Sequence, residues 1–458
     1  MLKFTKLTLI IALISLGINI SWAIEYPEMP QDIAFVKLLH ANDSAGENNA
    51  ETPLVEQPEV PIQKFNNEGY PLIESYSLQT PERISLSSID YNKYDIGYFY
   101  VVAINNAVNI RLQPNVDSPI VKSLGLYGKI NVFEKVNGQF FEKSNSDEWY
   151  RVYWYEKEEI KTGYIYAPIV AFRTFNFAGA LSEIENLETF FSTADHMGKV
   201  NNYKNYSGRA PLRAGSELDA YGHKGDQSAP LYVEADTKSD FRYLSDGQIF
   251  DILDMSTDMY YVYVPYFDQY GYIPSKFVST SNSVKVLEQA IFVDLHNQNI
   301  FTLQNEDGTW AVQSISYATS GKEAEFKEKT VPGYYAAIQK KDKFLYLDDV
   351  TDELDGYAPY AIRFNGGAYL HGFPVTYKWE TEQVLISPAE FDKDGIMIKE
   401  AVYEDVRIGG PIDPGMIEYS YTLGTVPLSH KCIRNPTSHA LFMYNWIVLD
   451  QSIIIISE

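Results

Sequence analysis

The segment Pro427-Leu-Ser-His-Lys-Cys-Ile-Arg-Asn435 contains Cys432, the only cysteine in a chain of 458 residues. A single thiol cannot form a disulfide within the chain, and in an exported protein it indicates intermolecular pairing or a reactive thiol. His430 and Arg434 flank the sulfur, each two residues away. Because nearby positive charge lowers the pKa of a thiol, this polar setting predicts a nucleophilic thiolate rather than a small buried apolar side chain.

A cysteine nucleophile needs a base within hydrogen-bond reach. Of the seven histidines, four lie in segments without a cysteine-like context, namely His40, His196, His223 and His296. His439 falls on a predicted helix, which indicates a structural role. His430 is fixed near the thiol by sequence, whereas His371 follows a predicted strand and precedes Gly372, where bare backbone permits close approach. His371 is the better candidate, because a residue distant in sequence can face the thiol across a cleft.

The first 23 residues have the features of a secretory signal peptide. Lys3 and Lys6 precede an apolar run over 7–20, and Ser21 and Ala23 occupy the positions that a signal peptidase inspects. A single membrane anchor is the alternative, but this run is shorter than the ~20 residues of a spanning helix. We expect an exported protein in the periplasm or associated with the cell wall, with no integral membrane segment after signal cleavage.

Composition excludes some partners and favours strands. The net charge is -24, with 61 acidic against 37 basic residues, which argues against nucleic acid because phosphate binding requires clustered Lys and Arg. Excess negative charge promotes solubility, so we expect a monomer. The 36 tyrosines and 24 phenylalanines favour β-structure.

Residues 24–92 are rich in Pro, Glu, Asn and Ser and lack sustained periodicity, as in Glu56-Gln-Pro-Glu-Val-Pro61. This composition predicts an acidic, Pro-rich tether with little core of its own.

Short strands separated by turn residues predict a small β-barrel from about residue 98 onward. The ordered features are Val108-Asn-Ile-Arg-Leu-Gln-Pro114, Gly128 before a strand, Trp149-Tyr-Arg-Val152 and Gly163-Tyr-Ile165. Residues 95–175 therefore resemble a bacterial SH3-like domain.

A second, looser copy covers residues 205–280. It keeps Tyr260-Tyr-Val-Tyr-Val264 and Gly271-Tyr-Ile273 but lacks the Asn-x-Arg element. Helical spacing over 182–191 predicts a connector between the copies. The resemblance implies modules that bind cell-wall peptides or position a catalytic domain, and a plain spacer is the alternative.

The last region carries further predicted strands, at about 291–295, 300–303, 310–315, 333–338, 360–364 and 416–421, and one helix over 436–446 that begins with Asn435 as its cap. Residues 288–450 resemble the L,D-transpeptidase catalytic domain, a cysteine peptidyltransferase family often called YkuD-type. The motif residues are His371-Gly372 and Ser429-His-Lys-Cys-Ile-Arg434, and Thr319-Ser-Gly-Lys322 and Thr330-Val-Pro-Gly-Tyr-Tyr335 are also similar to the family. The expected fold class is mainly β, with two small SH3-like barrels, a β-rich L,D-transpeptidase catalytic domain and one C-terminal helix.

The resemblance implies roles for individual residues. Cys432 would be the nucleophile, His371 its base, and the Gly372 carbonyl would orient His371. Ser429 belongs to the same motif and would help to bind the oxyanion or the substrate. His430 would line the site, and Arg434 would hold substrate or brace the loop. Backbone N–H groups of Lys431 and Cys432 are candidate oxyanion donors.

Two features depart from the family pattern. Lys431 replaces the usual Gly, although a non-Gly residue resists positive φ, and it adds a cation beside the thiol. The spacing between His371 and Ser429 is also longer, with an insertion at about 376–424. We expect this insertion to form a lid or subdomain over the cleft, and a surface elaboration without a role is the alternative.

The implied reaction is a two-step acyl transfer on peptidoglycan stem peptides. A thioester forms with a stem tetrapeptide, a D-amino acid leaves, and an amine of a second stem resolves the thioester. If water resolves it, the chain is an L,D-carboxypeptidase that trims stems.

Other classes are less consistent with the sequence. A papain-like protease would carry its cysteine near the mature N-terminus and its histidine downstream. A catalytically degenerate wall-binding protein is another alternative, suggested by the two modules and Lys431. One cysteine and scattered histidines do not give the spacing of a zinc site, and no cofactor is implied.

Overall fold

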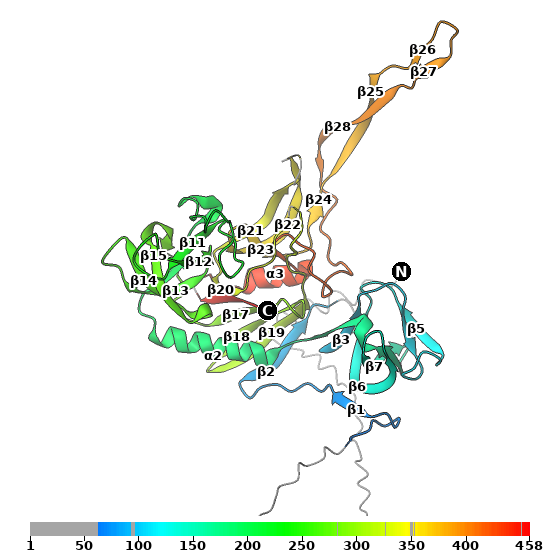
Figure 1. The fold of residues 1–458 in the computed structure, drawn as a ribbon, viewed down its shortest axis with the longest axis horizontal. Coiled ribbons are helices and arrows are strands. Elements are labelled where there is room, and N and C mark those ends of the chain that lie inside the picture. The colour runs from blue at the N-terminus through cyan, green and yellow to red at the C-terminus, as the bar shows by residue number, and fades with distance from the viewer. Residues whose placement is uncertain are drawn as a thin grey trace, which may run out of the picture. The chain divides into compact units, whose positions relative to one another are not determined.

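The computed structural model describes residues 63–92, 97–281, 283–325, 327–348, 351, 353–449 and 451–458. The chain divides into two compact units, Met1–Tyr70 and Pro71–Glu458. In the first unit the described residues form a turn in which the backbone N–H of Gly69 donates to the Asn66 carbonyl over 3.0 Å. The predicted signal peptide and His40 lie outside the described residues. In the second unit strands dominate, which confirms the mainly β prediction (Figure 1).

The expected first module forms a sheet in which seven strands pair antiparallel, in the order β5-β4-β8-β7-β6-β3-β9. Its own core contains Val101, Ile110, Val132 and Val152, all buried. The strands are β3 (Phe99–Ala103), β4 (Val108–Arg111), β5 (Ile120–Leu124), β6 (Lys129–Phe141), β7 (Ser146–Glu156), β8 (Glu159–Tyr166) and β9 (Val170–Thr174), with a 3₁₀ turn η1 (Ala167–Ile169) between the last two.

The second sheet repeats this topology. Its order, β12-β11-β15-β14-β13-β10-β16, equals the first order with every strand number raised by seven. The strands are β10 (Met197–Val200), β11 (Ser228–Tyr232), β12 (Phe241–Ser245), β13 (Ile249–Asp254), β14 (Met259–Val264), β15 (Gln269–Pro274) and β16 (Val278–Ser279), with 3₁₀ turns η2 (Tyr203–Asn205), η3 (Pro265–Phe267) and η4 (Ser275–Phe277). The shared order supports the predicted repeat, and the SH3-like nature of the two modules stays a prediction. The second module begins at β10 rather than at residue 205.

Helix α2 (Phe177–Thr193) connects the two modules and is longer than the predicted segment. The Asn176 side chain caps it by accepting a hydrogen bond from the Gly179 backbone N–H. Its buried face carries Ala180, Ile184 and Leu187, which join a core shared with the C-terminal region. Since apolar residues recur at helical spacing, the sequence specified both the helix and its buried face.

Two sheets build the C-terminal region. The six-stranded sheet has the order β2-β19-β18-β17-β30-β20, and a second sheet has the order β21-β22-β23-β29 with β24 paired to β22. The strands of the first sheet are β2 (Ile84–Asp90), β17 (Gln289–Asp294), β18 (Asn299–Glu306), β19 (Thr309–Tyr317), β20 (Gly333–Ala336) and β30 (Ser452–Ser457). Those of the second are β21 (Gln339–Leu347), β22 (Leu354–Asn365), β23 (Ala368–His371), β24 (Val375–Thr376) and β29 (Ile433–Arg434). Helix α3 (Thr437–Trp446) packs against β22 and β23 and buries Ala440 and Met443.

Two segments of the predicted tether form strands of the sheets described above. This corrects the expectation that the tether up to residue 92 has little core of its own. Strand β1 (Leu72–Ser75) pairs with β6, and β2 pairs in parallel with β19. Ile84 is buried, and Arg83 forms an ion pair with Glu188 at 2.6 Å. A strand that pairs with an existing sheet edge needs few buried positions of its own, so the short apolar alternation in Ile84-Ser-Leu86 is sufficient.

The expected C-terminal boundary at residue 450 is also wrong. Strand β30 lies between β17 and β20 in the six-stranded sheet, and Ile453 to Ile456 are fully buried. A continuous apolar run buried on both faces is typical of a central strand. By contrast, the strand predicted at 416–421 does not form.

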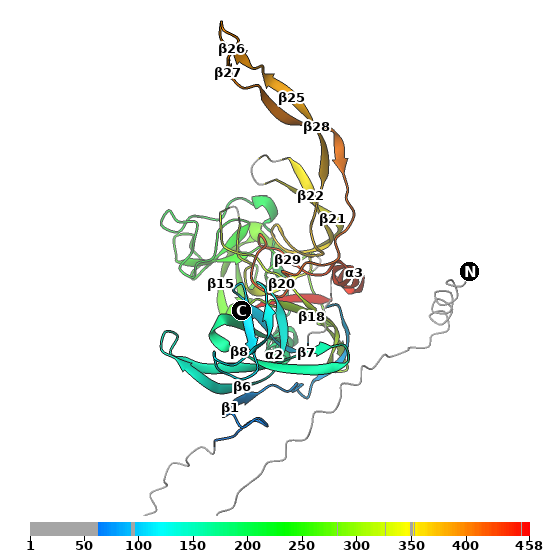
Figure 2. The same cartoon turned by 90° about the vertical axis from the view of Figure 1, so that its right-hand side faces the viewer.

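The insertion at about 376–424 forms an extended hairpin instead of the expected lid or subdomain. Strands β25 (Lys378–Ser387) and β28 (Val402–Ile412) pair along their length, and β26 (Glu390–Phe391) pairs with β27 (Met397–Lys399) at the tip. Every residue of β28 is exposed, and the hairpin extends away from the strands that precede it (Figures 1 and 2). Acidic and apolar residues face each other across the strands, as in Glu382 opposite Val406, so neither face is apolar enough to be buried on the cleft.

Among the described residues, no helix combines the length and apolar character required to cross a bilayer.

Substituting Ile84 by Ala tests whether β2 is a structural strand. Because Ile84 is 5% exposed and packs in the shared core, we expect the free energy of unfolding to fall by about 2–4 kcal/mol. Ile89 on the same strand is 53% exposed, so Ile89→Ala is the matched control and should change stability by less than about 0.5 kcal/mol. Urea unfolding of both variants measures the difference, and equal losses would contradict the docking of β2.

Candidate active site

His371 is the last residue of β23, and Cys432 directly precedes the neighbouring strand β29. β23 and β29 pair in parallel, with Leu370 opposite Ile433 and His371 opposite Arg434. The segment 429–434 is therefore placed beside the His371-Gly372 motif, although the two are separated by the long insertion. The sequence predicted that these residues would meet, and the strand pairing brings them together.

The alternation of side chains along these strands puts the reactive groups on one face. Leu370 and Ile433 are fully buried in the core beneath the sheet. Because successive side chains point to opposite faces, the neighbouring positions His371, Cys432 and Arg434 point away from that core. All three line one cleft of about 1500 Å³.

The orientation of His371 is fixed by its backbone surroundings. Its Nδ1 lies 2.6 Å from the Gly372 carbonyl oxygen, and since a carbonyl can only accept, Nδ1 carries the proton and Nε2 is the basic nitrogen. The Asn435 backbone N–H and side-chain Nδ2 both donate to the His371 carbonyl, at 3.1 and 3.0 Å. Asn435 thus holds the backbone of His371 in place. The sequence predicted that Asn435 would cap helix α3, but the residue at the cap position is Pro436, which makes no side-chain hydrogen bond.

Other residues approach the backbone of Gly372 closely, as the sequence predicted. A Cβ atom at this position would lie 2.8 Å from Thr437 Oγ1 and 2.9 Å from Pro359 Cγ. A larger residue would displace the carbonyl that holds His371, which gives a physical reason for glycine after the histidine.

The Cys432 thiol is buried, at 8% exposure, against Tyr369, Ala361 and Phe344. Its Sγ lies 3.8 Å from the Gly367 carbonyl oxygen. Burial raises the pKa of the thiol above its ordinary value, and this outweighs the lowering by the Tyr369 backbone N–H, Arg434 and Lys431. The prediction of a thiolate favoured by flanking cations is therefore wrong for the free protein, because desolvation is the larger effect.

The base is also held in its neutral form. Burial lowers the pKa of His371, the hydrogen bond to Gly372 raises it and the positive charge of Arg434 lowers it, and the net result is a pKa of about 4. At neutral pH the pair therefore rests as thiol and imidazole.

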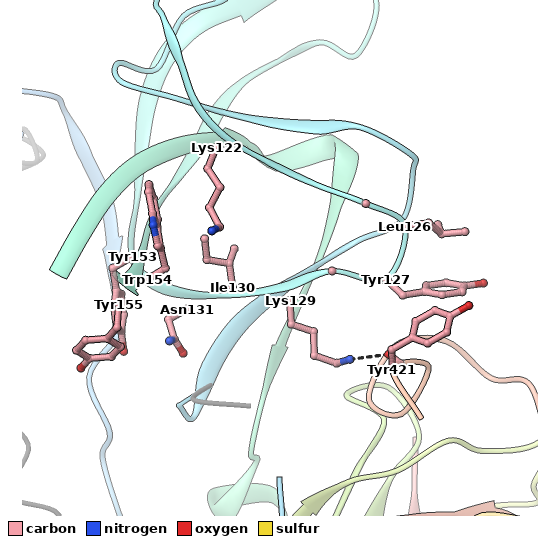
Figure 3. A pocket seen from close by; sticks show the side chains of 12 residues that line it. Lys122, Leu126, Tyr127, Lys129, Ile130, Asn131, Tyr153, Trp154, Tyr155 and Tyr421 are labelled. Carbon is pink, nitrogen blue, oxygen red and sulfur yellow. Dashed lines mark hydrogen bonds between the residues drawn. The ribbon is translucent and has the colours of Figure 1, made fainter. Parts of the chain in front are cut away.

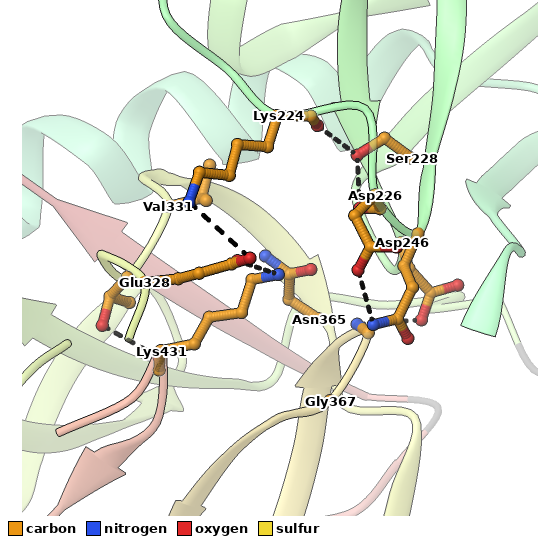
Figure 4. A network of polar contacts seen from close by, with 12 residues as sticks. Lys224, Asp226, Ser228, Asp246, Glu328, Val331, Asn365, Gly367 and Lys431 are labelled. Atoms are coloured by element: carbon orange, nitrogen blue, oxygen red, sulfur yellow. Dashed lines mark hydrogen bonds and ion pairs between the residues drawn. The ribbon is translucent and has the colours of Figure 1, made fainter. Parts of the chain in front are cut away.

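Lys431 replaces the glycine of the family motif, and its backbone nevertheless adopts the left-handed conformation. Its φ is 63°, and contacts on three sides hold it. The backbone N–H donates to the Glu328 carbonyl, the Lys431 carbonyl accepts from Thr330 Oγ1, and Nζ lies 2.8 Å from Glu328 Oε2 (Figure 4). Glu328 also contacts Lys224 of the second module at 3.7 Å. Glu328 therefore compensates the charge of Lys431 and limits its effect on the thiol.

Two expected roles in this loop are not compatible with the structure. The backbone N–H groups proposed as oxyanion donors are occupied, since that of Lys431 donates to Glu328 and that of Cys432 donates to the His430 carbonyl over 2.6 Å. Ser429 is fully buried and its hydroxyl donates to the Cys432 carbonyl, so it braces the loop and does not bind substrate.

Arg434 and His430 both reach the cleft. His430 is exposed, and Arg434 is half-buried with its backbone bonded to Thr319 over 2.8 and 3.0 Å. Among the described residues, Arg434 Nε has no hydrogen-bond partner. A guanidinium with a free donor beside the thiol is suited to stabilise negative charge.

Several residues of the cleft were missed by the sequence analysis. They share positions on the facing walls and come from the second module, from β21 and from the base of the hairpin: Tyr203, Lys204, Asp226, Gln227, Lys341, Phe344, Pro414 and Met416. No local motif marks them, because each wall is assembled from segments distant in sequence. Gln227 and Lys204 do have a local signal in the structure, which is positive φ.

A second cavity, of about 500 Å³, lies between the first module and the loop around Tyr421 (Figure 3). Lys129 Nζ donates to the Tyr421 carbonyl over 3.0 Å, and burial lowers the pKa of this amine to about 8. Its lining residues include neither cysteine nor histidine. This cavity therefore has no cysteine–histidine pair of the kind present in the larger cleft.

The described residues contain no cluster of three or more His, Cys, Asp and Glu side chains suited to hold a metal ion.

Thiol alkylation at varied pH tests the neutral pair. Since burial holds the pKa of Cys432 above its ordinary value, the rate constant for alkylation by iodoacetamide should keep rising above pH ~9. Cys432 is the only cysteine, so mass spectrometry of the whole protein reports on this site alone. A rate plateau at pH ~5–7 would instead indicate a thiolate–imidazolium pair.

No protein-family model matches the chain, and no curated protein matches it. Several solved structures that match part of the chain are L,D-transpeptidases. An L,D-transpeptidase from Mycobacterium smegmatis is 16% identical, with 46% of this chain and 82% of that chain covered and a TM-score of 0.24. An Enterococcus faecium L,D-transpeptidase, solved as a cysteine-to-serine mutant, is 13% identical, with 50% and 75% covered and a TM-score of 0.26. L,D-transpeptidase 3 from Mycobacterium tuberculosis, in complex with a faropenem-derived adduct, is 14% identical, with 47% and 78% covered and a TM-score of 0.24.

Proposed function

We propose that this chain is a cysteine acyltransferase of the L,D-transpeptidase type that acts on peptidoglycan stem peptides. The observation that carries the proposal is that the pairing of β23 with β29 puts His371 and the adjoining Cys432 along the same cleft, which both residues line. The sequence motifs around both residues support the same reaction class. A cleft of about 1500 Å³ exceeds the ~300–1,000 Å³ of ordinary small-molecule sites, as a branched peptide substrate requires.

In the first half-reaction the sulfur attacks the carbonyl carbon of the bond that precedes the terminal D-amino acid. The thiol proton passes to His371 Nε2 as the carbon–sulfur bond forms, because the resting pair is neutral. His371 then protonates the departing nitrogen, the carbon–nitrogen bond breaks, and a free D-amino acid leaves a thioester on Cys432.

In the second half-reaction an acceptor amine attacks the thioester carbonyl. His371 takes one proton from the amine and returns it to the departing sulfur, so the carbon–nitrogen bond forms as the carbon–sulfur bond breaks. The product is a direct crosslink between two stems, and the free thiol is restored. Attack by water in place of the amine gives the carboxypeptidase outcome from the same residues.

Stabilisation of the tetrahedral intermediate falls to Arg434 in this proposal. The Lys431 and Cys432 backbone N–H groups already donate to carbonyl groups, whereas Arg434 lines the cleft and its charge acts on the Cys432 thiol. A cation in a low-dielectric site stabilises a developing oxyanion more than it would in water.

The variant Cys432→Ala tests the nucleophile. We expect loss of D-amino-acid release from a purified stem tetrapeptide, because no other cysteine is available. Intact-protein mass spectrometry should show a thioester adduct on the native chain and none on the variant. Release at an equal rate by the folded variant would refute the assignment.

The variant His371→Ala tests the base. Acyl-enzyme formation should slow by about 10²–10⁴-fold, since a general base contributes factors of this size. His296 is exposed and outside the cleft, so His296→Ala is the matched control and should acylate at the native rate. Similar rates for the two variants, followed by quenched flow and mass spectrometry, would show that another group takes the proton.

A further inference from the structure

The second module forms one wall of the active-site cleft. Tyr203, Lys204, Asp226 and Gln227 all line the cleft that contains Cys432. Gln227 lies close to the segment that contacts the sulfur. A Cβ at Gly366 would lie 3.2 Å from the Gln227 side chain, and the carbonyl oxygen of the next residue, Gly367, lies 3.8 Å from Cys432 Sγ. The module therefore presents side chains close to the nucleophile.

This wall has an unusual concentration of left-handed backbone. Lys204, Asn205 and Gln227 have φ of 53°, 56° and 51°, although none is glycine. Such conformations cost free energy and persist only where surrounding contacts impose them, typically at functional sites. Two of these residues, Lys204 and Gln227, line the cleft.

A closed set of hydrogen bonds maintains these conformations. Lys204 N–H donates to Gln227 Oε1 over 2.8 Å, and Gln227 N–H donates to Asn205 Oδ1 over 2.9 Å. Asn205 Nδ2 and Gln227 Nε2 in turn donate to the two oxygens of Asp226, over 2.8 and 3.1 Å. The strained residues thus hold one carboxylate in a fixed orientation at the cleft.

The two charged side chains of this wall have opposite signs. Burial alone would raise the pKa of Asp226, but the bonds from Asn205 and Gln227 and the charges of Lys431 and Arg209 lower it below its usual range. Asp226 is therefore an anion at neutral pH. Lys204 forms no ion pair within the described part of the chain, and its Nζ lies 5.6 Å from the centre of the Tyr203 ring.

Docking of the second module does not require either side chain. Asp246 of the module binds Arg363 at 2.7 Å and accepts from the Gly366 N–H over 3.1 Å, and both contacts are buried. Within the described part of the chain, the hydrogen bonds to the Asp226 carboxylate come from Asn205 and Gln227 of its own module. Its ordered carboxylate calls for an explanation other than packing.

We propose that Asp226 and Lys204 form the acceptor site of the reaction described above, on which this inference rests. The ligand class is an amine that carries a carboxylate on the same carbon, as at the amino-acid end of a second stem. Asp226 would accept hydrogen bonds from the ammonium and Lys204 would pair with the carboxylate, at the edge of the cleft beside the thioester.

In the aminolysis step the bound ammonium releases one proton to solvent and becomes a nucleophilic amine. As this nitrogen bonds to the thioester carbon, its second proton passes to His371 Nε2 and from there to the departing sulfur. The second module thereby favours aminolysis over hydrolysis, because it holds the amine where water would otherwise attack.

The test measures the ratio of aminolysis to hydrolysis from one acyl-enzyme, which does not depend on the rate of acylation. The full chain is acylated with a stem tetrapeptide in the presence of glycine, or of methylamine, which lacks the carboxylate. Products are separated and quantified by mass spectrometry. With wild-type protein, glycine should be used at least about tenfold more efficiently than methylamine, as expected for one charge-assisted contact.

Two variants and one control decide the proposal. Asp226→Asn should lower the ratio for both amines by at least about tenfold, and Lys204→Met should lower it for glycine alone. Glu234, which is exposed on the β11–β12 connection of the same module and outside the cleft, gives the control Glu234→Gln, with the native ratio expected. Lys204 donates to Gln227 through its backbone N–H, so Lys204→Met leaves this hydrogen bond in place. The Lys204 variant therefore still tests the proposal if Asp226→Asn fails to fold.

Native ratios in the variants would overturn the acceptor site while leaving the acyltransfer proposal standing. If wild-type protein forms no acyl-enzyme, the proposed function fails, and the acceptor site fails with it.

Discussion

The parallel pairing of β23 with β29 is the constraint on which the site depends. It is short, yet it sets the register that puts His371 beside Arg434 and turns the reactive side chains away from the core. A slip by one residue would bury these groups and expose Leu370 and Ile433, because side chains alternate between the faces of a sheet. The register is secured from below by those two apolar residues and from the side by the bonds between Thr319 and Arg434. Precision at the site is thus a consequence of packing beneath it.

Electrostatics in the site follow from burial more than from the number of charges. Three cationic side chains lie near the thiol in sequence, and charge counting predicts a thiolate. In the folded chain the sulfur is packed against aromatic and aliphatic groups, Glu328 is paired with Lys431, and the His371 imidazole is desolvated. In the proposed reaction this neutral pair would separate substrate binding from activation, because the sulfur would become charged only while its proton moves to His371.

Much of the architecture could be predicted from patterns within short windows. The strands of the two modules, helix α2 and the meeting of His371 with Cys432 followed from periodicity and motif spacing. The errors arose where one segment depends on another far away. β2 has a weak pattern because β19 supplies its pairing edge. β30 lies beyond the domain boundary that was expected at residue 450, and the cleft wall at Asp226 is set by contacts across the second module. Likewise, the sequence around Lys431 does not indicate that Thr330 and Glu328 stabilise its left-handed backbone.

The central position of β30 has a consequence for how the molecule is made. A ribosome delivers β17, β18 and β19 long before Ser452–Ser457, yet β17 and β20 have no shared neighbour until that segment arrives. Until then, the edges of β17 and β20 that pair with β30 are unpaired, and unpaired strand edges make a folding chain prone to aggregate. The sheet whose Ile454 and Ile456 pack with Leu370 and Ile433 beneath the cleft is therefore complete only after β30 has been synthesised.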